Sequence, residues 1–293
     1  MKIGEAYGAG KFGLSFELFP PKTEAGETEL FHHVQRLVEF RPDFITCTYG
    51  AGGSTRKKTL DIVEQVQTRF GCAVASHLTC VGSTADELRS YLREAAARQV
   101  ENIVALRGDP PAGQTEFTAV PGGLSYANEL VSLVRREFPS FGLAVADYPE
   151  THREAPSPEI DLENLKRKVD AGADIVITQL FYDNDDFWRF RDRCDRLGIR
   201  IPIVPGILPV TNLAQIERIV GLCGATLPPE FQAALARSGG TPEDQFRVGV
   251  EFATRQVCGL LDGGIPGLHF YVLNKSHATT GVLESVTLPR ANA

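Results

Sequence analysis

Polar side chains stand at or just beyond the end of nearly every short apolar run in this sequence. Glu17 ends a run that begins at Gly13, and Asp109 follows a run that begins at Asn102. Burial in an apolar strand is expected to raise the pKa of Glu17, so that it can donate a proton near neutral pH. Glu17 could instead be a buried carboxylate paired with a basic residue. Asp109 could be a fixed charge beside a cationic intermediate or cofactor, or a turn cap before two prolines.

Eight such runs recur along the 293 residues and are expected to be strands. They begin at Gly13, Asp43, Ala73, Asn102, Gly142, Ile175, Ile201 and Leu268. Both faces of the runs are apolar, which is typical of parallel strands covered by helices. The last interval is about twice the others and predicts helices around 212–223 and 242–261, with an extra segment near 228–237. We therefore predict one domain over residues 1–293, a (β/α)8 TIM barrel with extra helices before strand eight. A doubly wound sheet is the alternative.

Local signals predict where several helices begin and end. Thr84 and Glu87 have the spacing of a capping box, and Asp161 is expected to cap the helix that follows it. Three glycines lie between a helical run and the next strand, where a left-handed residue is favoured: Gly71, Gly172 and Gly198.

The carboxyl ends of barrel strands meet at one face, and active sites lie there. Polar or turn-forming residues occur at all eight predicted ends, which predicts a pocket. These residues are Glu17, Thr48, Tyr49, His77, Thr79, Arg107, Asp109, Tyr148, Glu150, Gln179, Pro205, Gly206, Asn274 and Lys275.

Composition excludes several classes of protein. The net charge of −7 and the pI near 5.5 argue against a nucleic-acid binder. No apolar run approaches the roughly 18 residues that span a bilayer, and no export signal is evident, so a cytoplasmic protein with reduced, mostly buried cysteines is expected. His77 and Cys80 are three apart on a strand and point to opposite faces, so no metal site is expected.

Two further segments could bind phosphate. The loop 50–55 has the glycines of a phosphate cradle, but Thr55 stands where the dinucleotide motif has its last glycine, so it is expected only to lie near a cofactor above the barrel. Asn164, Arg167 and Lys168 share about one helical turn. That turn is either a solvated helix face or an anchor for a diphosphate.

Nine ordered segments, from about residue 13 to 276, resemble the compact bacterial form of the methylenetetrahydrofolate reductase family. They read SFELFPPK, TCTYGAGGST, SHLTC, IVALRGDPP, ADYPETH, NLKRKVDAGAD, ITQLFYD, PGILPVTN and HFYVLNK. The resemblance implies a TIM barrel that binds FAD without a Rossmann domain, in a homo-oligomer. It implies reduction of 5,10-methylenetetrahydrofolate to 5-methyltetrahydrofolate by NADH or NADPH, in two half-reactions through one site.

The resemblance also implies roles for individual residues. Glu17 matches the general acid that opens the folate ring to an iminium, and Asp109 matches a carboxylate near flavin and pterin. Thr48 matches a nicotinamide contact, and the folate contacts are Glu17, Asp109, Gln179, Gln215 and Lys275. Relatives often have arginine where this chain has Lys275, so folate affinity could differ. The positions matching FAD contacts are Tyr49, Ala51, His77, Arg107, Gly108, Asp109, Ala127, Tyr148, His152, Ala155, Asp161, Asn164, Arg167 and Lys168.

Two alternatives stay open at this point. One is another FAD-binding barrel oxidoreductase, similar to proline dehydrogenase; the other is a folate- or flavin-binding protein without turnover. Intact Glu17, Asp109 and Gln179 favour an enzyme, because a binding module does not need a positioned acid. Although the chain is acidic, we expect its barrel mouth to be locally basic through four cations. These are Arg107, Arg167, Lys168 and Lys275.

Overall fold

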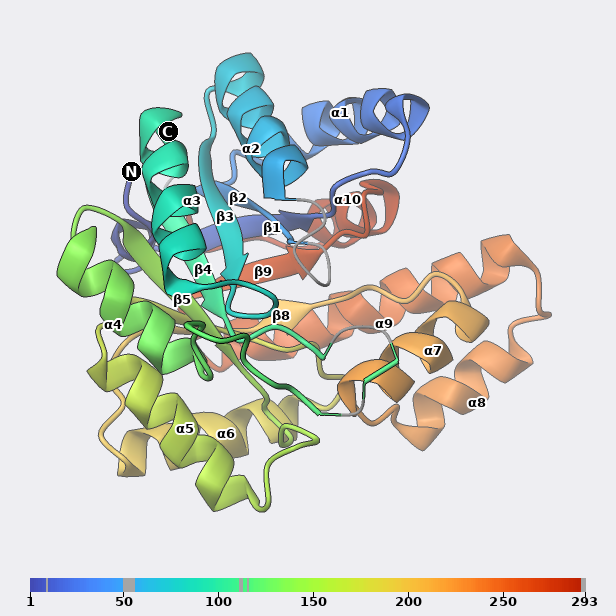
Figure 1. Ribbon diagram of the computed structural model, residues 1–293. Helices are drawn as coiled ribbons and strands as arrows, with labels where there is room; N and C mark the ends of the chain where they lie inside the picture. Colours follow the sequence, from blue (N-terminus) through green and yellow to red (C-terminus); the bar gives the residue numbers. More distant parts are fainter. Residues whose placement is uncertain (9, 50–55, 111–112, 115, 291–293) are drawn as a thin grey trace.

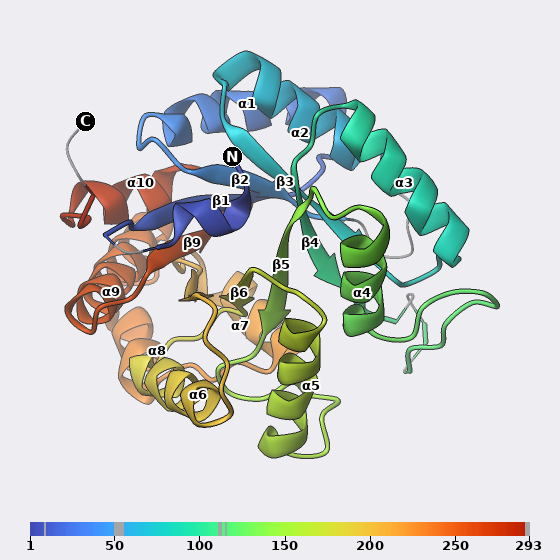
Figure 2. The ribbon, with the colours of Figure 1, turned by 90° about the vertical axis from the view of Figure 1, so that its left-hand side faces the viewer.

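A ring of parallel strands stands at the centre of the molecule, with helices around it (Figure 1; Figure 2). The computed structural model describes residues 1–8, 10–49, 56–110, 113–114 and 116–290. The strands are β1 (Gly13–Leu18), β2 (Phe44–Cys47), β3 (Ala73–Thr79), β4 (Asn102–Leu106), β5 (Gly142–Asp147), β6 (Ile175–Thr178), β7 (Ile203–Val204), β8 (Gly206–Ile207) and β9 (Gly267–Tyr271). Their order is β7-β6-β5-β4-β3-β2-β1-β9-β8, and every pairing is parallel. The predicted TIM barrel is confirmed.

The seventh predicted strand is divided in two at Pro205. Its first half, β7, pairs with β6, and its second half, β8, pairs with β9. Proline has no N–H to donate to a ladder, so regular pairing breaks at this residue. The Pro205 carbonyl still accepts a hydrogen bond from the His269 backbone N–H at 3.1 Å, and Gly206 N–H donates to the Thr178 hydroxyl at 2.9 Å. The divided strand therefore joins the two edges of the sheet.

The helices follow the predicted alternation with the strands. They are α1 (Glu24–Val38), α2 (Arg56–Phe70), α3 (Ala85–Ala97), α4 (Ala127–Glu137), α5 (Pro158–Asp170), α6 (Asn184–Arg196), α7 (Leu213–Cys223), α8 (Pro229–Arg237), α9 (Pro242–Asp262) and α10 (His277–Glu284), with a short 3₁₀ helix η1 (Ile3–Ala6) at the start. The extra helices predicted before strand eight are confirmed as α7, α8 and α9. These three lie together on one side of the barrel (Figure 1).

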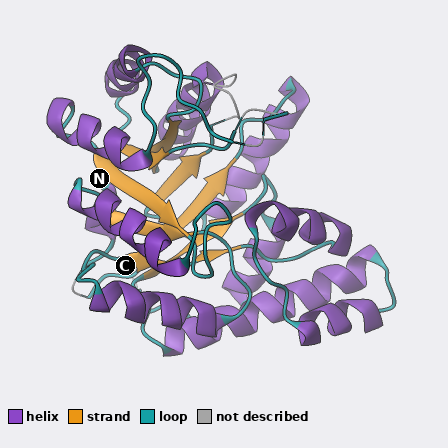
Figure 3. Ribbon diagram, turned by 60° about the horizontal axis from the view of Figure 1, so that its bottom comes forward, coloured by secondary structure: helices purple, strands orange, loops and turns teal. Residues whose placement is uncertain are grey.

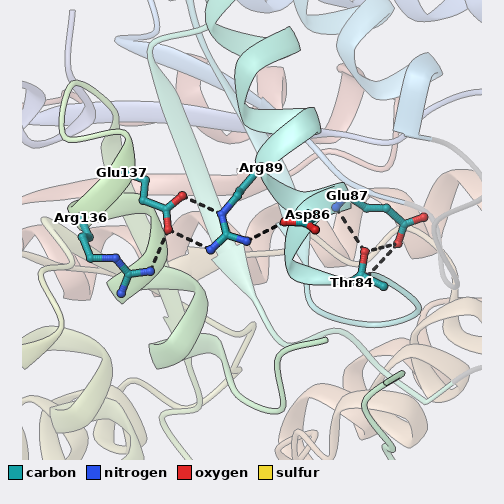
Figure 4. Close-up of polar contacts among 6 residues, drawn as sticks. All are labelled: Thr84, Asp86, Glu87, Arg89, Arg136 and Glu137. Carbon is teal, nitrogen blue, oxygen red and sulfur yellow. Dashed lines mark hydrogen bonds and ion pairs between the residues drawn. The ribbon is translucent and has the colours of Figure 1, made fainter. Parts of the chain in front are cut away.

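The capping box predicted at the start of α3 is confirmed (Figure 4). Thr84 N–H donates to the Glu87 carboxylate at 2.8 Å, and Glu87 N–H donates to the Thr84 hydroxyl at 3.3 Å. Two residues after Glu87, the Arg89 guanidinium contacts both oxygens of Glu137, at 2.7 and 3.0 Å. Because Glu137 ends α4, this pair ties two neighbouring barrel helices together.

Of the other predictions about helix ends, the three glycines are confirmed and the cap at Asp161 is wrong. Gly71, Gly172 and Gly198 have φ values of 63°, 114° and 75°, so the left-handed helix ends are confirmed. The prediction that Asp161 caps its helix is wrong. The helix starts earlier, at Pro158, because the Ser157 side chain accepts the free N–H of Ile160 and proline fits the first turn.

Three apolar clusters fill the structure. The largest lies between the strands and the surrounding helices, which enclose the sheet (Figure 3). A second fills the barrel interior, where Ile3, Ala6 and Tyr7 of the N-terminal segment meet strand residues such as Phe44 and Val104. The third lies under α7, α8 and α9; its members include Leu180, Tyr182, Leu208, Val210, Ile216, Phe231 and Leu235. The extra helices thus have a core of their own beside the carboxyl ends of the strands.

Five of the six cysteines are buried and all six are free thiols, as expected for a reduced protein. Within the described ranges, no helix combines the length and the apolar character that crossing a bilayer requires.

Two helical glycines provide a matched test of packing. A Cβ at Gly249 of α9 would stand 1.5 Å from the Val210 carbonyl oxygen, whereas a Cβ at Gly221 of α7 would meet nothing within 4 Å. We expect Gly249→Ala to lower the free energy of unfolding by about 1–3 kcal/mol through overpacking. We expect Gly221→Ala to raise it by roughly 0.5–1 kcal/mol through helix propensity. Urea unfolding of both variants checks this; equal effects would contradict the close contact at Gly249.

Candidate active site

Glu17 lies at the end of β1, and two imidazoles approach it from other strands. Its Oε2 atom is 3.3 Å from His77 Nε2 and 3.6 Å from His269 Nε2. All three side chains are buried. The Ser15 hydroxyl lies 2.8 Å from His269 Nδ1, because the β1–β9 register places Ser15 opposite His269. Serine, histidine and glutamate therefore form a line of polar groups inside the barrel.

The protonation of Glu17 differs from the sequence expectation. Burial alone would raise the pKa of its carboxyl group, as expected. His77 and His269 outweigh burial, however, and bring the pKa down to about 2. The prediction of a raised pKa is therefore wrong for this arrangement, since a buried carboxylate between two imidazoles is held ionised. The other option, a buried carboxylate paired with basic residues, describes the contacts that Glu17 makes.

Aromatic and amide groups line the neighbouring strand ends. The Tyr148 hydroxyl is hydrogen-bonded to the Gln179 side chain, and burial raises the pKa of Tyr148 to about 12. The His152 ring packs edge-on against Tyr148 with ring centres 4.7 Å apart. Burial lowers the pKa of His152. Two aromatic rings and an amide thus lie together beyond the ends of β5 and β6.

Arg107 leaves β4 and is already paired. Its guanidinium contacts both oxygens of Glu154, at 2.7 and 2.9 Å, and lies over the Phe117 ring at 5.1 Å. The next residue, Gly108, has φ +87°, and a Cβ there would come within 2.7 Å of the Val81 side chain. Only glycine suits this turn, which presents the exposed Asp109 beyond β4.

The two cationic side chains of α5, Arg167 and Lys168, point in different directions. Arg167 is 61% exposed and donates to the Asn164 side chain at 2.9 Å. Lys168 turns inward, where its side chain is only 14% exposed and its ammonium is 3.0 Å from Asp147 Oδ1. Asp161, on the first turn of α5, accepts the His152 backbone N–H at 2.6 Å. Asp161 therefore holds the loop that carries His152.

The remaining predicted residues lie around this centre. Thr48 and Tyr49 follow β2, with the Tyr49 ring 5.8 Å from that of Tyr91. Ala127 begins α4, and Ala155 N–H donates to the His152 carbonyl at 2.9 Å. Gln215, on the first turn of α7, and Lys275, just after β9, are exposed. Ala51 and the glycine loop 50–55 lie outside the described residues.

Sequence reasoning missed Ser15, His269, Asp147 and Glu154. Ser15 and Glu17 are two apart on one strand and therefore share a face, which was a usable signal. His269 stood in a predicted strand, but its partner is 254 positions away. Among the described residues no group of three His, Cys, Asp or Glu side chains could hold a metal ion.

Comparison with known proteins decides the family. A family model described as methylenetetrahydrofolate reductase matches residues 2–287. The chain belongs to this family. A methylenetetrahydrofolate reductase of Escherichia coli is 38% identical over 277 residues, which cover 94% of this chain and 91% of that protein. An NADH-type methylenetetrahydrofolate reductase of Zea mays is 40% identical over 297 residues, which cover 98% of this chain and 50% of the maize protein. The chain thus spans about half the length of its plant relatives in the methylenetetrahydrofolate reductase family.

Solved structures agree on the fold. A Clostridium thermocellum protein described as binding two copies of 5-methyl-5,6,7,8-tetrahydrofolic acid superposes with a TM-score of 0.60 at 15% identity, covering 94% of each chain. An oxaloacetate acetylhydrolase superposes with a TM-score of 0.52 at 11% identity. At these identities, the likeness supports the barrel architecture alone.

The lowered pKa of Glu17 predicts part of the acid sensitivity of folding. Since the folded pKa of about 2 lies below the ordinary 4.5, ionised Glu17 stabilises the fold above pH 4.5 and this contribution is lost as the pH falls toward 2. Between pH 6 and 3.5 the loss should reach about 1–2 kcal/mol. Glu17→Gln should remove this part of the pH dependence of the free energy of unfolding, measured by urea unfolding across this pH range. An unchanged slope in the variant would contradict an ionised Glu17.

Proposed function

We propose that this protein reduces 5,10-methylenetetrahydrofolate to 5-methyltetrahydrofolate, with FAD as its bound cofactor and NADH or NADPH as electron donor. The observation that carries the proposal is the buried Glu17, held by His77 and His269 at the carboxyl ends of the strands. A family of reductases that protonates a folate needs an acid at this place, and active sites of barrels lie at this face. Membership of the family supports the substrate.

The residues at the mouth fit a flavin. Thr79 Oγ1 is buried near Gly108 and has no hydrogen-bond partner in the described part of the chain, so a polar ring edge can satisfy it. Tyr148 and His152 add two aromatic rings after the end of β5. The residues that would hold FAD are Tyr49, Ala51, His77, Arg107, Gly108, Asp109, Ala127, Tyr148, His152, Ala155, Asp161, Asn164, Arg167 and Lys168. When bound, FAD supplies a hydride carrier between the nicotinamide and the folate.

The protein's own contribution is proton delivery and charge stabilisation. The Nε2 atoms of His77 and His269 both lie within 3.6 Å of Glu17 Oε2. A proton can pass through either imidazole ring to Glu17 and from there to a folate nitrogen. Burial already favours the protonated carboxyl. A bound folate that moves an imidazole away would therefore raise the pKa of Glu17. We therefore assign the proposed acid function to Glu17, His77 and His269 acting together.

Asp109 and the polar strand ends complete the site. The exposed carboxylate of Asp109 would favour a cationic iminium form of the folate, since opposite charges attract strongly where water is excluded. Gln179 and Thr48 would contact the nicotinamide, and Gln179 would also contact the folate. Gln215 and Lys275 are exposed and can reach the outer part of a bound folate. The same site would then bind the nicotinamide and the folate in turn.

Bound flavin is the first test. The purified protein should be yellow with the absorbance bands of an oxidised flavin, and NADH or NADPH should bleach them under anaerobic conditions. Rates with the two nicotinamides at matched concentration identify the preferred donor. A colourless preparation that FAD cannot reconstitute would overturn the proposal.

Replacing Glu17 should separate the two half-reactions. We expect Glu17→Gln to keep flavin reduction by the nicotinamide within a few-fold and to slow reoxidation by the folate by about 10²–10⁴-fold, the usual contribution of a general acid. Stopped-flow absorbance measures each step. Asp43→Asn is the control, because Asp43 lies at the opposite end of the β1–β2 pair and binds Leu14 N–H and Arg290. Equal slowing of both steps in the Glu17 variant would refute the acid role.

A further inference from the structure

Asp147 is a buried carboxylate at the end of β5 that the proposed chemistry does not use. Its residue is 3% exposed. One oxygen, Oδ1, accepts a hydrogen bond from Lys168 Nζ at 3.0 Å. The other oxygen, Oδ2, is buried without a hydrogen-bond partner in the described residues. A carboxylate with one unsatisfied oxygen is costly to bury and is poised to accept a proton.

The partner of Asp147 is held inside by two contacts. The Lys168 ammonium donates to the Ala146 carbonyl as well as to Asp147. An ammonium has three N–H donors, so one remains for a ligand. The charge of Lys168 is meanwhile offset by Asp147, and the pair presents little net attraction to an anion.

The charged groups around Asp147 come from two helices. Lys168 and Asp161 face it from α5, and Arg193 faces it from α6, where the Cys194 thiol also lies close. Burial raises the pKa of Asp147 to about 6; Asp161 adds to the rise, and Lys168 and Arg193 oppose it. Arg193 donates to the Pro149 carbonyl at 3.1 Å, so it is not a second direct partner of the carboxylate.

We infer that Asp147 makes cofactor binding proton-linked: as a carboxylate it restrains Lys168, and on protonation it releases the ammonium to the diphosphate. The inference rests on the proposed function for the identity of the anion and for its contact with Lys168. A diphosphate arriving next to Lys168 repels the carboxylate of Asp147, and taking up a proton relieves that repulsion. Asp147 is thus a residue that sets cofactor affinity without touching the cofactor.

The sign of the pH effect follows from this linkage. Binding raises the pKa of Asp147 further above its value in the free protein, so the complex holds more protons than its separate components. Affinity for FAD should therefore fall as the pH rises from about 5.5 to 7.5, by at most tenfold per pH unit for one linked proton. His152, whose pKa burial lowers, is another titrating group beyond the end of β5 and needs its own control.

Calorimetric titration of the flavin-free protein with FAD tests the inference. At pH 6.5, buffers of different ionisation heat should reveal uptake of a substantial fraction of a proton by the unaltered protein. Asp147→Asn, which keeps the shape of the side chain, should abolish this uptake and bind FAD several-fold more tightly at pH 7.5. Lys168→Met should bind more weakly and lose most of the pH dependence. His152→Gln should keep the uptake.

The opposing results are distinct. If the unaltered protein binds FAD without taking up a proton, the inference is overturned. This test does not depend on the folding of any variant. Weaker binding by Asp147→Asn with its fold intact by circular dichroism would also overturn it, and would mean that Asp147 only positions Lys168. If FAD does not bind the unaltered protein at all, the proposed function itself fails.

Discussion

The ladder between the first and the last strand of the barrel fixes the chemistry of this protein. It places Ser15 opposite His269 and Glu17 opposite Tyr271, so that residues from the two ends of the chain face one interior. A shift of one residue in this register would turn Glu17 out of the barrel and separate it from both imidazoles. The pairing of the strands thus brings Glu17 next to His269, more than 250 positions away in the sequence. It therefore helps to determine the protonation state of the Glu17 carboxyl group.

Much of the fold could be predicted because its signals are local. Apolar runs, the box at Thr84 and Glu87, and the glycines after helices depend on neighbours within a few residues. The same local reasoning placed the start of α5 wrongly, since Ser157 and Pro158 compete better for the first turn than Asp161 does. It also treated the seventh strand as one run, although a proline without an N–H divides it at the place where the sheet edges meet.

The site was predicted less completely because its properties arise between distant segments. Glu17 was recognised by residue type, but its ionisation depends on His77 and His269, which only the closed barrel brings to it. The positive charge predicted for the barrel mouth is likewise reduced by ion pairs. Arg107 is matched by Glu154, Lys168 by Asp147 and Arg167 by Glu163, so three of the four cations meet an anion before any ligand does. Only the pair of Arg167 and Glu163, four residues apart on α5, has a sequence spacing that would reveal it.

The N-terminal segment gives the barrel a closed floor. Ile3 is fully buried against the amino ends of the strands, where its N–H donates to Asn102 at 2.6 Å, and Ala6 and Tyr7 fill the interior beside it. The amino-terminal face of the barrel is therefore filled by the chain's own side chains, so a ligand of the proposed kind would reach Glu17 from the carboxyl-terminal face. Under the proposed function, each ligand would then enter and leave on the same side. Alternating occupancy of one site would follow from this filled end of the barrel.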